Sequence, residues 1–269
     1  MRRLAERVPG EALSPPVELR LIALPDFPPV AKGDDLAALT AQALTRGGLA
    51  LSTGDVLVFA QKVISKAEGR RVDLATVVPS AAALELAHTV QKDPRLVEMV
   101  LRESRRVVRC ARDVLIVEHR QGFIMANAGI DQSNVADPAG GEFALLLPED
   151  SDASAARLRD RLRTLTGCEP GIVISDSFGR PWRVGTVGVA IGCAGFPATL
   201  DLRGQMDLFG RPLRVTVVGH ADEIASAASV LMGQGSEARP VILVRGVGSR
   251  APHQPATALI RPPEQDLFR

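Results

Sequence analysis

The feature that most constrains the fold is segment 171–185, in which a short apolar strand runs directly into polar side chains. Residues 172–174 are β-branched and apolar, a pattern that predicts a buried strand. We expect this strand to stop at Asp176 and Ser177 and to continue as an open loop over residues 179–183 rather than as an ordinary hairpin. Ligands of α/β sheets bind beyond the ends of such strands, so the segment points to a site as well as to a fold class.

The side chains that follow the strand suit metal ions and phosphates. The carboxylate of Asp176 and the hydroxyl of Ser177 are hard oxygen donors, which Mg²⁺ and Mn²⁺ prefer. Arg180 and Arg183 suit phosphate or carboxylate oxygens, and Trp182, the single tryptophan, lies between them. The alternative is a solvated turn whose arginines pair with nearby acids, with Trp182 packed into the core.

Apolar runs and helical periodicities alternate along the chain, which predicts a mixed α/β fold. Strands are expected at residues 17–24, 56–60, 114–117, 122–126, 172–174, 215–218 and 241–244. N-caps of helices are expected at Asp34, at Asp93, at Asp152 or Ser154, and at Asp222. The charged run 102–106 is expected on an exposed helix face.

Composition excludes several function classes. The net charge of +1 provides no field that attracts nucleic acid or an anionic membrane, and the sequence contains no tyrosine for stacking on bases. No apolar run is long enough for a membrane span. The three cysteines lack the spacing of a metal site, which fits a reducing cytoplasm and buried thiols. We therefore expect a cytoplasmic protein without nucleic-acid or membrane partners, with residues 1–16 as a flexible leader.

Four polar loops follow predicted strands or helices, at residues 61–66, 127–134, 176–183 and 233–236, and a shared site is plausible. Asp131 and Asp176 could hold a cation between them, with Ser177 and Asn134 completing an oxygen shell. If a helix follows residue 60, Lys62 and Lys66 could both reach phosphate oxygens. The alternatives are an exposed basic face for the lysines and a turn cap for Asp131. Neither of the two common nucleotide-binding glycine motifs is present.

Six motifs carry a resemblance to a known family. They are QKVISKAEGR at 61–70, ANAGIDQSN at 126–134, SDSFGRPWR at 175–183, DLFGR at 207–211, ADEIASAA at 221–228 and VRG at 244–246. In this order they resemble the coenzyme F420-0:L-glutamate ligases over about residues 19–246. Ordered agreement over nearly the whole chain is far more specific than any one motif.

The resemblance implies a mixed α/β gamma-glutamyl-ligase-like fold at residues 17–247, an intertwined homodimer and no standard Rossmann domain. It implies a GTP-dependent ligase that needs two divalent ions, Mg²⁺ or Mn²⁺, with K⁺ as a further candidate. The enzyme would add L-glutamate to the lactyl carboxylate of the deazaflavin F420-0, or of its dehydro precursor, through an acyl phosphate. Further γ-linked glutamates could follow.

The resemblance also assigns residues. Asp131 and Asp176 match metal-binding aspartates, Ser177 matches a hydroxyl position, often threonine, at a second metal, and these three are the candidate catalytic residues. Gln234 lies in the last nucleotide and metal segment. Nucleotide-contacting positions are Lys66, Asn134, the loop of Leu24, Pro25, Asp26 and Phe27, and Gln61, where some members have serine. Residue chemistry adds Lys62, Arg180 and Arg183 as phosphate ligands.

Two other functions stay open on sequence grounds. One is a paralogue that binds nucleotide or deazaflavin without ligation, and the other is a metal-dependent phosphoryl-transfer enzyme that activates a different carboxylate. Actinobacterial relatives continue into a flavin domain, whereas residues 248–269 form a short proline-bearing tail. Because residues 260–262 and 266–268 still resemble the region after the ligase domain, we expect this tail to pack.

Overall fold

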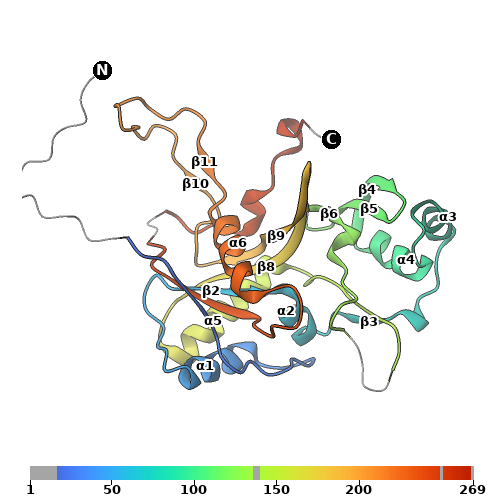
Figure 1. Ribbon diagram of the computed structural model, residues 1–269, viewed down its shortest axis with the longest axis horizontal. Coiled ribbons are helices and arrows are strands. Elements are labelled where there is room, and N and C mark those ends of the chain that lie inside the picture. Colours follow the sequence, from blue (N-terminus) through green and yellow to red (C-terminus); the bar gives the residue numbers. More distant parts are fainter. Residues whose placement is uncertain (1–16, 136–139, 249–250, 268–269) are drawn as a thin grey trace, which may run out of the picture.

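A five-stranded sheet lies at the centre of the computed structural model, which describes residues 17–135, 140–248 and 251–267 (Figure 1). Its order is β1 (Arg20–Ala23), β12 (Val241–Arg245), β2 (Val56–Ala60), β8 (Gly171–Arg180) and β9 (Arg183–Ala194). Only β2 and β8 pair in parallel, and the other neighbours are antiparallel. The prediction of a mixed α/β fold outside the Rossmann type is therefore confirmed. The expected leader, residues 1–16, lies outside the described residues.

Helices cover both faces of this sheet, which is why its inner strands are apolar at successive positions. Leu57 and Phe59 face α1 (Leu36–Arg46) and α5 (Ser151–Thr166), whereas Val56 and Val58 face α6 (His220–Met232). Side chains alternate in the same way along β8, so Ile172 and Ile174 belong to the first core and Val173 to the second.

Asp93 caps the helix Pro94–Arg102 as predicted, but the other three predicted N-caps differ from those in the structure. Asp35, not Asp34, caps α1 by accepting a hydrogen bond from the Ala38 N–H, and Asp150 caps α5. The N-cap of α6 is Gly219, so Asp222 lies inside the first turn. The Asp222 carboxylate is instead bonded to the Ala190 N–H at 2.9 Å, which ties α6 to β9. From the sequence alone, an acidic N-cap cannot be distinguished from an acid whose carboxylate accepts a hydrogen bond from a neighbouring strand.

A second sheet packs against two helices beside the central one (Figure 1). It contains β4 (Ser104–Ala111), β5 (Val114–His119) and β6 (Ile124–Ala126), with α3 (Ala81–Val90) and α4 (Pro94–Arg102) over it. The expected helix face at 102–106 is wrong, because α4 ends at Arg102 and β4 begins two residues later. Arg106 pairs there with Glu118 of β5, with Nε 2.8 Å from the carboxylate. Charge compensation across the strands explains a strand rich in arginine.

Two smaller ladders complete the fold. The strands β3 (Arg71–Asp73) and β7 (Phe143–Leu145) pair antiparallel, and Asp131 forms an isolated bridge to Leu145. The short strands β10 (Leu200–Asp201) and β11 (Val217–Val218) close the base of a long arm that projects from the molecule (Figure 1). The remaining helix α2 (Gln61–Ala67) follows β2 directly, and short 3₁₀ turns occupy 74–76, 127–129, 256–259 and 263–265.

The β8–β9 hairpin corrects the prediction for segment 171–185. The strand continues past Asp176 and Ser177 to Arg180, and β9 pairs with it antiparallel from Arg183, with register shifts after Ile174 and after Gly179. Pro181 and Trp182 form the turn, with Trp182 at a φ of 58°. Proline favours a turn at this point, and the left-handed conformation of the next residue completes it. Trp182 is 84% exposed, so it is not a core residue.

The C-terminal segment packs on the edge of the central sheet. Ala256 is fully buried, and its N–H donates to the Asp152 carboxylate at 2.7 Å. The same carboxylate accepts a hydrogen bond from the Cys193 N–H of β9 at 2.8 Å. Asp152 therefore joins α5, β9 and the tail.

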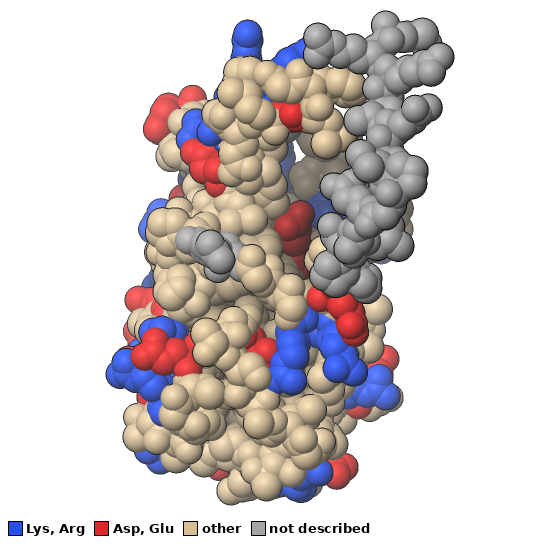
Figure 2. Space-filling model, turned by 90° about the vertical axis from the view of Figure 1, so that its left-hand side faces the viewer, with Lys and Arg blue, Asp and Glu red and all other residues tan. Residues whose placement is uncertain are grey.

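Acidic and basic side chains are interspersed over the face drawn in Figure 2, among a majority of other residues. Within the described part of the chain, no helix is long and apolar enough to span a membrane. The three cysteines are free: Cys193 is buried, Cys168 is half-buried and Cys110 is exposed, so the expectation of buried thiols is confirmed for Cys193 alone.

Candidate active site

Topology brings the polar loops together at one edge of the central sheet. Strands β1 and β2 both end at this edge, β12 begins there, and β8 continues beyond it. The Leu24 N–H donates to the Val241 carbonyl at 3.0 Å, and the Ala60 N–H donates to the Pro240 carbonyl at 2.8 Å. The segments after β1, after β2 and before β12 are therefore neighbours.

Asp131 is the most densely bonded acid of the site. Its carboxylate lies 2.6 Å from Lys62 Nζ and accepts hydrogen bonds from the Ser133 N–H at 2.7 Å and the Ser133 hydroxyl at 2.8 Å. Its backbone is fixed by two hydrogen bonds with Leu145, of 3.0 and 2.8 Å. Burial raises the pKa of Asp131, but the bonds from Lys62 and Ser133 outweigh burial and hold the pKa below its usual value.

At Asp176 the effect of burial on the pKa outweighs that of the hydrogen bonds and charges that favour the carboxylate. Burial, supported by the negative charge of Asp131, raises the pKa of Asp176 to about 7, while a hydrogen bond from the Ser177 N–H and the charge of Lys62 oppose the rise. Two carboxylates that repel each other in this way are stabilised by a cation placed between them.

This donor set fits Mg²⁺ or Mn²⁺. The described residues contain no group of three or more His, Cys, Asp or Glu side chains that could hold a metal ion. Mg²⁺, however, is commonly held by one or two carboxylates together with waters and substrate phosphates. Asp131 and Asp176 would supply the carboxylates, and waters or the phosphate oxygens of a substrate would complete the shell.

Ser177 and Gln234 form a separate pair. The Ser177 hydroxyl donates to the Gln234 side-chain carbonyl at 2.7 Å. Because side chains alternate along a strand, Ser177 points to the α6 side of β8 and Asp176 to the other side. The Asn134 side-chain amide donates to the Gly235 carbonyl at 3.4 Å. This hydrogen bond joins the loop that carries Asp131 to the loop that carries Gln234.

Helix α2 presents the two lysines one turn apart. Burial, together with the positive charges of Lys62 and Arg71, lowers the pKa of Lys66. The Gln61 side chain is buried, and its carbonyl accepts a hydrogen bond from Ser65 at 2.9 Å. Its amide nitrogen has no hydrogen-bond partner among the described residues. A buried donor without a partner costs free energy, and a bound ligand or an ordered water would offset that cost.

The loop after β1 contributes backbone rather than side chains at two of its positions. Leu24 and Phe27 are buried in the core, so they can face a nucleotide only through main-chain atoms. Asp26 has a φ of 49°, and its carbonyl accepts a hydrogen bond from Arg46 at 3.0 Å, which fixes the loop together with Pro25.

The two arginines do not join the aspartates as the sequence suggested. Arg180 and Arg183 flank the hairpin turn, and four residues of strand separate Arg180 from Asp176, or about 13 Å. Arg180 donates to the Val184 carbonyl at 3.3 Å. The continuation of β8 beyond the sheet carries them away from the Asp131–Asp176 pair.

Sequence reasoning missed Ser133, which bonds both Asp131 and Lys62; the Lys62 contact is 2.7 Å. The Asp-x-Ser spacing was the available signal, because such a pair forms an Asx turn. It also missed Asn127 and Ala128, which hold φ values of 51° and 53° just before the site. Left-handed backbone at non-glycine residues costs free energy and clusters at functional sites.

The chain is similar to known proteins over most of its length. The family F420-0:Gamma-glutamyl ligase matches residues 26–246. A coenzyme F420:L-glutamate ligase from Methanothermobacter thermautotrophicus is 44% identical, covering 93% of this chain and 99% of the relative. Ligases of the same name from Methanopyrus kandleri and Methanocaldococcus jannaschii are 45% and 40% identical; the alignments cover 93% and 81% of this chain and 98% and 86% of those proteins.

The family match covers every predicted site residue except Leu24 and Pro25, which immediately precede it. The family model matches more than half of the chain, and two relatives above 40% identity align over nearly their full length. This chain belongs to the F420-0:gamma-glutamyl ligase family.

Proposed function

We propose that this protein is a GTP-dependent and divalent-metal-dependent ligase that adds L-glutamate to the lactyl carboxylate of coenzyme F420-0, with further γ-linked glutamates as a possible extension. The observation that carries the proposal is the juxtaposition of Asp131 and Asp176 beside Lys62 and Lys66 at one edge of the sheet. The names of the relatives support the substrates. We place the reaction in the cytoplasm.

The chemistry requires activation of the carboxylate. A carboxylate oxygen of F420-0 attacks the γ-phosphorus of GTP, the bond to the β-phosphate oxygen breaks, and GDP leaves. The amine of glutamate then attacks the carbonyl carbon of the acyl phosphate to form a carbon–nitrogen bond. The adduct loses a proton from this nitrogen to solvent, its carbon–oxygen bond to the phosphorus-bearing oxygen breaks, and inorganic phosphate leaves the new amide. Protein catalysis of such a transfer rests on positioning and on compensating charge.

The residues of the site have matching tasks. Asp131 and Asp176 would hold the divalent ion, with Ser177 and Gln234 as oxygen ligands at a second ion. Bound metal supplies charge neutralisation at the transferred phosphoryl group. Lys62 and Lys66 present ammonium groups to phosphate oxygens, Asn134 and Gln61 supply hydrogen bonds, and the backbone of the 24–27 loop borders the nucleotide.

We also propose a homodimer. The arm between β10 and β11 exposes large apolar side chains: Leu208 is 99%, Phe209 83% and Val215 85% exposed. A two-stranded arm has no core of its own, and exposed apolar groups of this size mark interaction surfaces. A second copy of the chain would cover the arm and protect it from water.

The direct test is a reaction with purified protein, GTP, Mn²⁺, L-glutamate and F420-0, analysed by mass spectrometry. The proposal predicts a product heavier by one glutamyl residue, or by several, and no product when GTP is omitted. Binding of GTP and deazaflavin without any product would favour a paralogue that does not ligate. Consumption of GTP only with a different carboxylic acid would favour the second alternative, a metal-dependent phosphoryl-transfer enzyme that activates a different carboxylate.

A further inference from the structure

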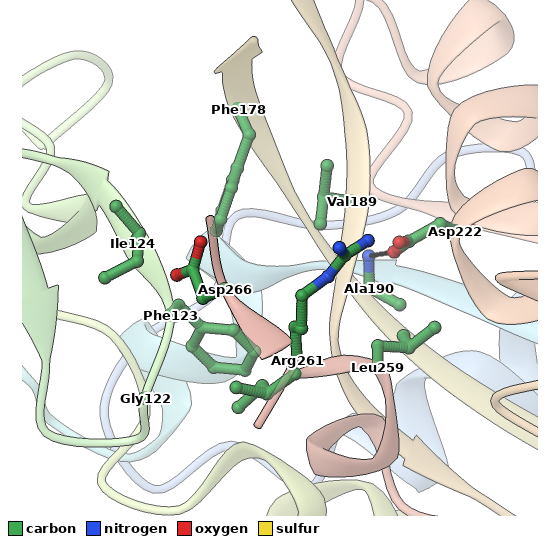
Figure 3. A pocket seen from close by; sticks show the side chains of 11 residues that line it. Gly122, Phe123, Ile124, Phe178, Val189, Ala190, Asp222, Leu259, Arg261 and Asp266 are labelled. Carbon is green, nitrogen blue, oxygen red and sulfur yellow. Dashed lines mark hydrogen bonds between the residues drawn. The ribbon is translucent and has the colours of Figure 1, made fainter. Parts of the chain in front are cut away.

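A cavity of about 190 Å³ lies outside the polar cluster, at the outer edge of β9 (Figure 3). Four segments distant in sequence form it: residues 122–124 at the start of β6, the β8–β9 hairpin, Asp222 of α6 and the C-terminal tail. Its apolar walls come from Phe123, Ile124, Phe178, Val189, Leu259 and Ile260. The tail therefore provides one wall of a pocket, a role that its sequence does not reveal.

The cavity combines aromatic walls with few charges. The rings of Phe123 and Phe178 meet edge to face, with centroids 6.4 Å apart. Arg261 is the single cation among the described lining residues, and Asp222 and Asp266 are the acids. Figure 3 shows the Arg261 side chain reaching across the cavity towards Val189 and Asp222, with the Phe123 ring on the other side.

The cavity adjoins the proposed metal site. Val189 is the cross-strand partner of Asp176 in the hairpin, so the two side chains share one face of the ladder. Opposed side chains have Cβ atoms about 5 Å apart. Phe178 lies two residues beyond Asp176 on the same face. A ligand in the cavity is therefore separated from Asp176 by the thickness of one side chain.

We propose that this cavity binds the fused-ring system of the F420 precursor, an inference that rests on the proposed function. Of the three substrates, the deazaflavin carries the largest planar ring system, and the guanine of GTP is smaller and more polar. Glutamate and GTP are multiply anionic, and a pocket with two carboxylates and one guanidinium disfavours both. Arg261 donates to a carbonyl oxygen of the ring, and the phenylalanine side chains pack against it.

The pocket assignment is tested by binding of F420-0 in the presence of Mn²⁺ and a non-hydrolysable GTP analogue, followed by the fluorescence of the deazaflavin. Loss of a hydrogen bond from a charged donor costs about tenfold in affinity, so Arg261→Ala should raise the Kd by about that factor. Ile124→Trp, which adds bulk at a position 37% exposed, should abolish binding without unfolding the protein. The matched control is Arg112→Ala, because the Arg112 side chain is 79% exposed on a distant turn.

Two further measurements separate the outcomes. Affinity for the GTP analogue and the thermal midpoint should stay at the wild-type values in all three variants. If wild-type protein binds F420-0 and both pocket variants bind it equally well, the pocket assignment fails while the proposed function stands. An increase in the KM for glutamate with an unchanged F420-0 Kd would assign the cavity to the amino acid and overturn the proposal. A wild-type protein that does not bind F420-0 overturns both.

Discussion

At the scale of single residues, the charge balance around Asp131 and Asp176 controls what this edge of the sheet can bind. Lys62 and Ser133 compensate Asp131 within the protein, whereas burial leaves Asp176 with a raised pKa. One acid is thus neutralised by the chain itself, and the other gains most from a bound cation.

Replacement of Asp176 by asparagine should abolish ligation and leave the fold intact, because a charged ligand is lost but no core volume changes. Asp176 retains its proton in the folded protein up to a pH of about 7, whereas its unfolded value is 3.8. The metal-free protein should therefore lose stability as the pH rises from 3.8 to about 7, and Asp176→Asn should remove this loss. Thermal unfolding across this range checks the sign, and turnover near wild type would contradict the metal assignment.

Lys66 offers a second test at this scale. Lys66→Ala should raise the KM for GTP more than the KM for F420-0, because a lysine ammonium best serves phosphate oxygens. Steady-state kinetics with each substrate varied in turn gives both values, and Lys66→Arg, which keeps the charge, is the matched control. Equal increases in the two KM values would place Lys66 elsewhere in the site.

At the scale of elements, the close approach of α6 to β9 positions the site loop that carries Gln234. Gly188 of β9 faces Ala225 of α6, and the Ser226 hydroxyl donates to the Gly188 carbonyl at 2.7 Å. The small residues of α6 allow this approach, and the end of the helix then places Gln234 beside Ser177.

A methyl group on Gly188 would collide with the carbonyl oxygen of Ala225. Gly188→Ala should therefore lower the free energy of unfolding by about 1–3 kcal/mol, the usual cost of overpacking. Gly179→Ala is the control, since Gly179 lies on β8 of the same hairpin and a Cβ there meets nothing within 4 Å. Chemical denaturation of the two variants compares them directly, and equal stabilities would show that α6 can shift without cost.

Elements buried on both faces were the easiest to predict. Strands β2 and β12 are apolar at successive positions, so their sequences indicate both their type and their central place in the sheet. The hairpin was missed because the polar residues after Ile174 resemble a loop, and only pairing with β9 makes them a strand. The arginine-rich strand β4 was missed because the charge of Arg106 is compensated by Glu118. Glu118 lies twelve residues further along the chain, so the pair is not visible as a local pattern.

Within the site, motifs named the candidate residues but not their arrangement. Asp131 and Lys66 could be named from sequence, whereas the opposite orientation of Asp176 and Ser177 required the strand to be known. The cavity at β9 could not be predicted, because it depends on where the tail around Arg261 comes to rest.

At the scale of the whole molecule, the proposed dimer makes activity depend on concentration. The exposed arm has to be covered if the native form is to avoid a large apolar surface in water. Because a folded monomer of an obligate dimer is not separately stable, dilution should reduce activity and thermal stability together.

Sedimentation over a wide concentration range provides the check. We expect a dimer that dissociates only at low concentration, and Phe209→Asp should shift dissociation to higher concentration because it places a charge on the covered face of the arm. Arg112→Ala, far from the arm in sequence, is the control. A monodisperse and fully active monomer of 28.6 kDa would contradict the dimer.

The proposed reaction requires that GTP activate the carboxylate of F420-0 before glutamate attacks. It is tested most directly by F420-0 whose lactyl carboxylate is labelled with oxygen-18, used with GTP, Mn²⁺ and L-glutamate. Because a carboxylate oxygen attacks the γ-phosphorus and then leaves with it, the inorganic phosphate formed should carry one labelled oxygen per ligation. Ligation that yields only unlabelled phosphate would rule out an acyl phosphate formed from this carboxylate.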